Sequence, residues 1–492
     1  MVTHIDLADV QGNLLRGYGS GKRYVRHLIV TVRNAAAARS FIADAADGMP
    51  PGPAITTSEE WTVRPLTCLN VGFSATGLAA LGLSRQCVDS FPAAFREGAV
   101  GRATKVGDVD QSDPSNWRDG MSDPDKVHAM WTIFADTIDA RDALSSELEV
   151  AWRRSGAFST TARLDGEGLD DDKVHFGYRD SISQPRFEID GEVIGREDAQ
   201  PVAPLGALLL GPYETTFPDV QWTLPEPSEL AVNGCFNAFR VLEQDVVGFE
   251  LFLHESAQRL LAEHPGMVHP EVDPVEFIAA KLMGRWRNGV PLSYAVEHAA
   301  MQMRPGGETE TDGRFVDGMP VLGDSDDLND FDYPDERHDF DDFDGTMCPM
   351  GAHIRRGNPR GSRIVQRSAN HTRPIVRRGV PYGPAYDPSA GDDGVPRGLL
   401  GSFLCADLAA QYEALMYDWI NLGLQDPRVT GTNDVIIGAN RSASSRFEIP
   451  FADGSSLTLR HFPRFTHTVG SVYLFCPSMT ALRHIAATPS TP

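Results

Sequence analysis

One order of strand-like and helix-like segments occurs twice along this chain of 492 residues, and this order restricts the fold more than any other feature. Apolar, β-branched runs predict strands, and apolar residues at helical spacing predict helices. The first half predicts strand, helix, strand, strand, helix, strand at 24–32, 34–46, 66–73, 126–134, 138–153 and 157–164.

The second half has a comparable order of segments. Strand patterns lie at 235–242, 402–408 and 464–476, and helical patterns lie at 246–262 and 274–286. A further helix would place Leu408, Tyr412, Leu415 and Trp419 on one face. This order predicts an α+β fold of two ferredoxin-like domains with antiparallel sheets, in preference to a parallel doubly wound sheet.

A stretch rich in turn-forming residues separates the two halves. TLPEPSEL, at 223–230, has three turn-forming Pro and Ser residues between periodic segments. We therefore predict domains at 1–228 and 229–492. The polar segment 101–125 is predicted to be a surface loop.

Charge and composition exclude several classes of protein. Hydrophobic residues make up 41% of the chain and charged residues 23%, which is typical of a globular protein and not of a disordered one. The formal net charge of −24 opposes binding to nucleic acid or to an anionic membrane surface. We therefore expect neither nucleic acid nor a membrane as a partner.

The sequence contains no recognisable targeting signal. The N-terminus lacks a basic region followed by an apolar run, and no apolar stretch is long enough to span a membrane. We expect a cytoplasmic protein. Its six cysteines are scattered without a CxxC pair, which predicts buried free thiols instead of zinc ligands or disulfides.

Two segments far apart in the sequence carry the strongest signs of chemistry. HFGYRDSISQPRF, at 175–187, places Asp180 in a glycine-bounded turn. CPMGAHIRRGNPR, at 348–360, places His353 among small and turn-forming residues. An acid and an imidazole together suggest an iron cofactor held between them.

The second segment leaves the choice of iron ligand open. His353 has small neighbours that allow a macrocycle to approach closely, and Arg355, Arg356 and Arg360 could bind haem propionates. Cys348 is a rival ligand because a thiolate also binds haem iron. Spacing alone does not choose between them.

An acidic segment at 323–344 is predicted to be a solvated loop. Clustered carboxylates also suit hard cations such as Mn²⁺ or Ca²⁺, so a cation site is the alternative. The interleaved aromatic residues predict that the loop packs onto the protein: Phe331, Tyr333, Phe340 and Phe343.

Segments spread over nearly the whole chain resemble the dye-decolourising peroxidases, a family of haem enzymes. The resemblance is carried by DVQGNLLRGYG, NVGFSATGLAALGL, HFGYRDSISQP, CFNAFRVLEQDV, KLMGRWRNGVPL, CPMGAHIRRGNPR, IVRRGVPYG and FTHTVGSVYLFCPS. The long acidic insertions resemble those of the larger members. The resemblance implies the dimeric α+β barrel type of fold, with haem b in the C-terminal domain.

The resemblance also implies roles for individual residues. The proximal ligand of the haem iron falls on His353, and the distal acid falls on Asp180. The distal arginine falls on Arg377, although Arg378 is adjacent. A carboxylate that orients the ligand imidazole corresponds to Asp434. Leu399 corresponds to the leucine over the iron, and it joins Arg355 among the residues expected to contact the cofactor.

The chemistry of peroxide cleavage needs these residue types. Asp180 could move a proton between the two peroxide oxygens. Arg377 could stabilise negative charge on the departing oxygen, because a guanidinium stays charged at any working pH. A carboxylate at Asp434 would raise the basicity of His353.

Two positions depart from the family pattern. Ser181 replaces the glycine of the distal motif, and a positive φ there would cost about 1 kcal/mol. Gly401 replaces a distal phenylalanine in RGLLGSF. We expect a larger distal pocket from this change.

The resemblance implies a peroxidase that uses hydrogen peroxide, through a high-valent ferryl intermediate, to oxidise dyes, phenols or metal ions. The partners would be peroxide and a small reducing substrate, with a homo-oligomer as an open possibility. A haem oxidase or oxygenase with a dedicated biosynthetic substrate is one alternative. A non-catalytic haem carrier is the other, but it would need neither Asp180 nor Arg377.

Overall fold

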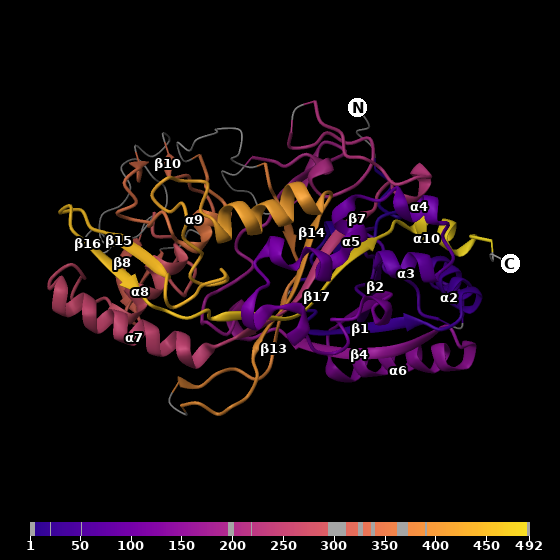
Figure 1. Ribbon diagram of the computed structural model, residues 1–492, viewed down its shortest axis with the longest axis horizontal. Helices are drawn as coiled ribbons and strands as arrows, with labels where there is room; N and C mark the ends of the chain where they lie inside the picture. Colours follow the sequence, from indigo (N-terminus) through magenta and orange to yellow (C-terminus); the bar gives the residue numbers. More distant parts are fainter. Residues whose placement is uncertain are drawn as a thin grey trace.

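The computed structural model describes residues 5–489 except 20, 51, 195–200, 218, 294–310, 323–327, 336–339, 362–371 and 389–390. The elements of the first half occupy one end of an elongated molecule, and those of the second half occupy the other (Figure 1). The long strand β17 (Thr466–Cys476) runs between the two ends.

The first half has the predicted elements and forms an antiparallel sheet in the order β2-β3-β1-β4. The elements are β1 (Tyr24–Val32), α2 (Ala35–Asp47), β2 (Thr67–Phe73), β3 (Ala129–Ala135), α6 (Ile138–Ser155) and β4 (Phe158–Glu167). This strand order is that of a ferredoxin-like unit, so the prediction for this half is confirmed. Asn34 and Thr137 cap α2 and α6 by accepting hydrogen bonds from backbone N–H groups.

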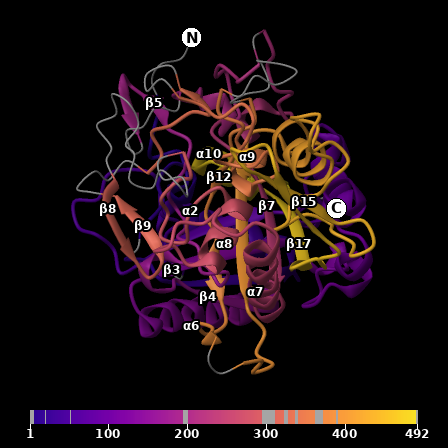
Figure 2. The same cartoon turned by 90° about the vertical axis from the view of Figure 1, so that its left-hand side faces the viewer.

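The second half repeats this arrangement. Its sheet order is β12-β14-β7-β17, and β13 also pairs with β14. The elements are β7 (Cys235–Gln244), α7 (Val246–Glu263), α8 (Pro274–Met283), β12 (Val376–Arg377), β13 (Val380–Tyr382) and β14 (Gly398–Cys405). The predicted helix after β14 is π-helical and divides into η11 (Leu408–Glu413) and η12 (Leu415–Asn421). Helices α7 and α8 lie together at the second-half end (Figure 2).

The two sheets join into one nine-stranded sheet whose ends meet. Phe475 of β17 pairs with Phe73 of β2, which connects the sheets. At the other ends, β4 packs on β13 so closely that a Cβ on Gly166 would lie 3.0 Å from the carbonyl oxygen of Pro381. The sheet is therefore curled into a barrel, as expected for the predicted fold type.

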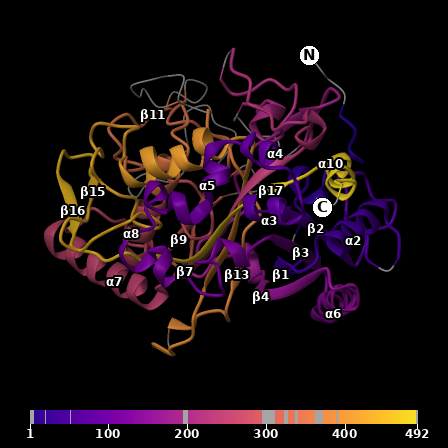
Figure 3. The ribbon, with the colours of Figure 1, turned by 45° about the vertical axis from the view of Figure 1, so that its right-hand side comes forward.

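The C-terminal helix α10 (Met479–Ala486) returns to the first half and lies beside α2 (Figure 3). Its Arg483 forms an ion pair of 2.7 Å with Asp47 at the end of α2. The sequence halves are therefore interlocked. Where they are described, residues 168–234 form only short elements between the two sheets. The domain boundary at residue 228 stays a prediction.

The remaining elements are short. They are α1 (Gly12–Leu15), α3 (Ala75–Ala80), α4 (Arg85–Asp89), α5 (Ala93–Arg102), β5 (Phe187–Ile189), β6 (Glu192–Ile194), β8 (Thr311–Val316), β9 (Met319–Leu322), β10 (Pro334–Asp335), β11 (Phe340–Asp341), α9 (His353–Gly357), β15 (Arg446–Pro450) and β16 (Ser456–Arg460). No helix among the described residues is both long and apolar enough to cross a membrane. All six cysteines are free, and all but Cys87 are buried, as predicted.

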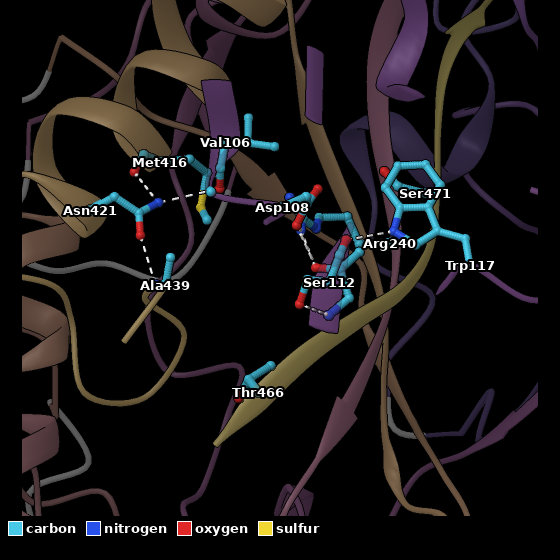
Figure 4. A network of polar contacts seen from close by, with 12 residues as sticks. Val106, Asp108, Ser112, Trp117, Arg240, Met416, Asn421, Ala439, Thr466 and Ser471 are labelled. Atoms are coloured by element: carbon cyan, nitrogen blue, oxygen red, sulfur yellow. Dashed lines mark hydrogen bonds and ion pairs between the residues drawn. The ribbon is translucent and has the colours of Figure 1, made fainter. Parts of the chain in front are cut away.

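The segment 101–125 differs from the predicted surface loop. It contains four short 3-10 turns, the first being η1 (Ala103–Val106), and it buries Asp108 and Trp117. Asp108 pairs with Arg240 of β7, and the backbone N–H of Thr468 in β17 donates to Ser112 (Figure 4). Because these polar groups find partners on the sheet of the other half, the segment can pack down despite its polar sequence.

Candidate active site

Asp180 and Arg377 come together although 197 residues separate them. The Nη1 atom of Arg377 lies 3.2 Å from Oδ1 of Asp180, and its Nη2 donates to the carbonyl of Ser183 at 2.9 Å. The side chain of Arg377 is 35% exposed and that of Asp180 is 32% exposed, so the pair is open to a small molecule. No hydrogen bond to another described residue engages Oδ2 of Asp180.

The backbone of the turn fixes the direction of Asp180. Its N–H donates to the carbonyl of Asp172 at 2.9 Å, and the N–H of Val174 donates to Tyr178 at 2.9 Å. The next residue, Ser181, has a φ of 62°. This is the positive value considered in the sequence analysis, and a non-glycine residue there carries a cost of about 1 kcal/mol.

Strand alternation distinguishes Arg377 from Arg378. Successive side chains in a strand point to opposite faces of the sheet. Arg377 faces Asp180, whereas Arg378 donates from Nε to the carbonyl of Asn13 at 2.9 Å. Burial lowers the pKa of Arg378 to about 10. The position next to the acid therefore belongs to Arg377.

Gln184 holds the Arg377 strand in place, and sequence reasoning missed it. Its Oε1 accepts from the N–H of Arg377, and its Nε2 donates to the carbonyl of Arg377, both at 3.1 Å. The amide thus pairs with the backbone as a neighbouring strand would. Its place in SISQP, four residues after Asp180, was the available signal.

Leu399, Gly401 and Phe403 alternate along β14 and share the sheet face of Arg377, which pairs directly with Phe403. A Cβ on Gly401 would lie 2.7 Å from the Phe403 ring. Phe403 therefore fills the space that a phenylalanine at 401 would take. The larger distal pocket expected from Gly401 stays a prediction, because an aromatic ring from two residues further along lies against this position.

His353 and Asp434 form a second pair. Nδ1 of His353 lies 3.1 Å from Oδ2 of Asp434, which is fully buried. The other oxygen, Oδ1, accepts from the N–H groups of Ile436 and Ile437 at 2.9 and 2.8 Å. This arrangement makes Nδ1–H of the imidazole the donor to Asp434 and leaves Nε2 as the ring nitrogen without a partner among the described residues.

The electrostatics keep Asp434 ionised. Burial alone would raise the pKa of its carboxyl group. The nearby His353 and Arg356, together with the N–H of Ile437, outweigh burial and hold the pKa below the ordinary value of 3.8. Asp434 is therefore a permanent acceptor for Nδ1–H at neutral pH.

Cys348 is a poor rival as a ligand. It is buried, its Sγ lies 3.6 Å from the hydroxyl of Tyr333, and burial raises the pKa of its thiol to about 11. Only the thiolate binds metal well. The geometry favours His353.

Arg355, which was predicted to contact the cofactor, is engaged by an internal ion pair. It follows His353 by two positions in α9, and residues at this spacing do not share a helix face. Its Nη1 donates to Oδ2 of buried Asp342 at 2.8 Å, and its guanidinium stacks on Tyr333. The expected cofactor contact conflicts with this internal ion pair. The other two arginines of the segment, Arg356 and Arg360, are also buried and donate to backbone carbonyls.

One helix connects the two pairs. Tyr412 of η11 stacks on Phe403 with ring centroids 5.5 Å apart, and the carbonyl of Ile420 in η12 accepts from the N–H of Asp434 at 2.7 Å. The π-helix thus packs on the sheet face of Arg377 at one end and on the segment of Asp434 at the other.

The donor set fits haem better than a bare metal ion. The described part of the chain contains no cluster of three His, Cys, Asp or Glu residues that could hold a metal. His353 offers a single imidazole nitrogen, which no described residue engages, and is 26% exposed. One imidazole suits an iron atom whose other ligands come with the cofactor.

The acidic segment 323–344 lies partly outside the described residues. In its described part, Phe331 and Tyr333 are buried as predicted, whereas Phe343 is exposed. Of the acids, Asp342 is committed to Arg355. The cation site stays a prediction.

Comparisons with known proteins agree over nearly the whole chain. The DyP dimeric alpha+beta barrel domain matches residues 10–167. A dye-decolorizing peroxidase of Mycena epipterygia is 29% identical over 98% of this chain and 87% of its own. The multifunctional dye peroxidase DyP2 of an Amycolatopsis strain is 27% identical over 97% and 96%.

Solved structures extend the agreement to the fold. A dye-decolorizing peroxidase in complex with 2,6-dimethoxyphenol is 25% identical and has a TM-score of 0.75, covering 98% of this chain and 100% of its own. The fungal DyP-type peroxidase of Auricularia auricula-judae has a TM-score of 0.78 at 23% identity and covers 99% and 100%. The chain therefore belongs to the DyP-type dye-decolorizing peroxidases, a family of haem enzymes.

Proposed function

We propose that this chain binds haem b through His353 and uses hydrogen peroxide to oxidise phenols and dyes. The observation that carries the proposal is the presence of two complementary pairs. One is an imidazole whose Nδ1 is held by a buried carboxylate, and the other is an open carboxylate in contact with an arginine.

Bound haem would supply the iron at which peroxide is reduced and would hold the resulting oxidising power. His353 would bind the haem iron through Nε2. Asp434 fixes the imidazole ring and, as a hydrogen-bonded carboxylate, raises the basicity of that nitrogen. Because Asp434 is buried and bonded through both oxygens, the ring has one defined orientation.

Asp180 is suited to move the peroxide proton. Its Oδ1 contacts Arg377, and its Oδ2 is left to accept a proton from one peroxide oxygen and to return it to the other. Arg377 is suited to stabilise the charge on the departing oxygen. Its second nitrogen is held by the carbonyl of Ser183, so the guanidinium stays directed at the site.

Phenols are the proposed reducing substrates. A related dye-decolorizing peroxidase has been solved with 2,6-dimethoxyphenol. In the present chain, the partial exposure of both Asp180 and Arg377 would leave room for a small organic molecule near the acid.

The test is the rate of reaction with peroxide, measured by stopped-flow absorbance on haem-loaded protein. Asp180→Asn should keep the haem Soret band and slow the reaction by about 10²- to 10⁴-fold, because the proton acceptor is lost. Asp171→Asn is the matched control, since Asp171 lies nearby, is exposed, and forms no part of the site. Equal rates for the two variants would refute the role of Asp180.

A further inference from the structure

A pocket of about 250 Å³ lies away from Asp180 and Arg377, at the junction of the two halves. Residues 104–109 form one wall, and η12 with residues 433–444 forms the others. Neither residue of the open acid–arginine pair lines it. The pocket therefore needs an explanation of its own.

The floor of the pocket is fixed by Asn421. Its Nδ2 donates to the carbonyls of Val106 and Met416 at 3.2 and 2.9 Å, and its Oδ1 accepts from the N–H of Ala439 at 2.8 Å (Figure 4). One amide thus joins three separate segments. This floor is formed before any ligand binds, which lowers the cost of binding.

The hydrogen bonds of Asp108 fix the wall formed by residues 104–109. Asp108 forms a buried ion pair with Arg240, and the hydroxyl of Thr468 also donates to Asp108, at 2.7 Å (Figure 4). Because Asp108 follows Lys105 and Gly107 closely in the chain, this network sets the position of the whole wall.

The pocket carries positive charge on an acidic protein. The ammonium of Lys105 lies 3.9 Å from the ring centroid of Tyr417 and has no carboxylate partner among the described residues. The second cation, Arg441, is neutralised by Asp110 at 2.7 Å. No Asp or Glu lines the pocket, although the chain as a whole has a net charge of −24. An anion is therefore attracted here, near a half-buried and uncompensated ammonium group.

The remaining lining suits one aromatic ring. Tyr417 is 37% exposed and lies with Val109 and Leu422 in the walls. Nδ2 of Asn433 donates to the carbonyl of Ala439 at 2.9 Å, which leaves Oδ1 to accept from a phenolic hydroxyl. The volume is below the range of about 300–1,000 Å³ that drug-sized ligands occupy, so a single ring is the appropriate size.

We propose that this pocket is a second ligand site, and that it binds a single-ring aromatic carboxylate with a phenolic hydroxyl. The carboxylate pairs with Lys105, the ring packs against Tyr417, and the hydroxyl donates to Asn433. Binding needs neither peroxide nor the acid–arginine pair, so the site is independent of the proposed peroxidase activity.

The test is calorimetric titration of haem-loaded, full-length protein with 4-hydroxybenzoate in the absence of peroxide. The uncharged 4-hydroxybenzyl alcohol, with the same ring and hydroxyl, is the comparison probe. Lys105→Met should weaken the binding of 4-hydroxybenzoate by about tenfold or more, because only the charge-assisted hydrogen bond is lost. The affinity for 4-hydroxybenzyl alcohol should not change. Lys126→Met is the matched control, since this exposed lysine pairs with Asp123 and does not line the pocket.

A second variant tests the role of charge by adding a negative group to the pocket instead of removing the positive one. Thr104→Glu places a carboxylate at the exposed rim of the pocket and should abolish binding of 4-hydroxybenzoate by repulsion. The proposal is overturned if Lys105→Met and Lys126→Met bind the carboxylate equally. It is also overturned if the wild type shows no binding below about 10 mM, or if Arg377→Leu removes binding while Lys105→Met retains it.

Discussion

The Asp180–Arg377 and His353–Asp434 pairs have nearly the same contact distance, 3.2 and 3.1 Å, but very different surroundings. The first pair is about one-third exposed on both sides. In the second pair, the carboxylate is fully buried and accepts two backbone N–H groups besides the imidazole.

This difference matches what each pair has to do. A group that exchanges protons with a small molecule has to be reachable, and its contacts have to leave one oxygen available. A group that orients a ligand has to be rigid, and low dielectric surroundings strengthen its hydrogen bonds. The open Asp180–Arg377 pair is therefore suited to proton transfer, and the buried His353–Asp434 pair is suited to orienting a ligand.

The largest expected effect is at His353. His353→Ala should abolish the Soret band after haem supplementation, because no other described imidazole is held by a buried carboxylate in this way. Cys348→Ser should retain the band, since the Cys348 thiol is buried and its pKa is raised to about 11. Absorbance spectra of both purified variants decide the matter. If the His353→Ala protein still binds haem, His353 is not the iron ligand.

The next effect concerns the open pair. Arg377→Lys keeps the positive charge but loses the planar fork, in which one nitrogen contacts Asp180 and the other contacts the Ser183 carbonyl. The rate of peroxide reaction should fall by about 10²-fold or more while the Soret band persists.

Arg118→Lys provides the control for this prediction. Arg118 makes a comparable two-nitrogen contact, with Glu243, on the surface. If both lysine variants react at the wild-type rate, the geometry of Arg377 is unimportant and only its charge matters.

The buried pair should show a smaller, pH-dependent effect. Asp434→Asn should lower haem affinity by about 10- to 100-fold. It should also reduce the free energy of unfolding by about 1–3 kcal/mol near neutral pH, because the acceptor for His353 is weakened.

The sign of the pH dependence follows from the pKa of Asp434. Its folded value is depressed below 3.8, so the carboxylate contributes stability that is complete above that value and is lost as the pH falls through the folded pKa. Urea unfolding should therefore show a gap between wild type and Asp434→Asn that closes in strong acid. A gap independent of pH would contradict the ionised state assigned to Asp434.

Most of the fold could be predicted from the sequence because the periodic segments carry the signal. The strand 24–32 has the bounds of β1, since a β-branched run between polar residues allows little else. The helix predicted at 274–286 ends at Met283 because Gly284 adopts a φ of 92°. A left-handed glycine is the usual helix end, and its presence in KLMGRW was visible.

The site was harder to predict because it depends on which face each side chain occupies. Arg377 and Arg378 are indistinguishable by type, and only pairing of β12 with β14 separates them. The ring of Phe403 lies where a side chain at Gly401 would project, because the two positions share a strand face. The alternation of side chains along the strand could have indicated this. Arg355 was assigned by proximity to His353, whereas helical phase turns it towards Asp342.

The smallest expected effect lies beside the open pair, at Ser181. This residue holds a φ of 62°, which glycine adopts without the steric cost that a serine carries. Ser181→Gly should therefore change the free energy of unfolding by about 1 kcal/mol or less, in the stabilising direction if strain exceeds the added entropy of the unfolded chain. Thermal unfolding of the haem-loaded protein measures this. Because the turn conformation is retained, the rate with peroxide should stay at the wild-type value. A large loss of rate would mean that the serine itself, and not only the backbone it occupies, takes part in placing Asp180.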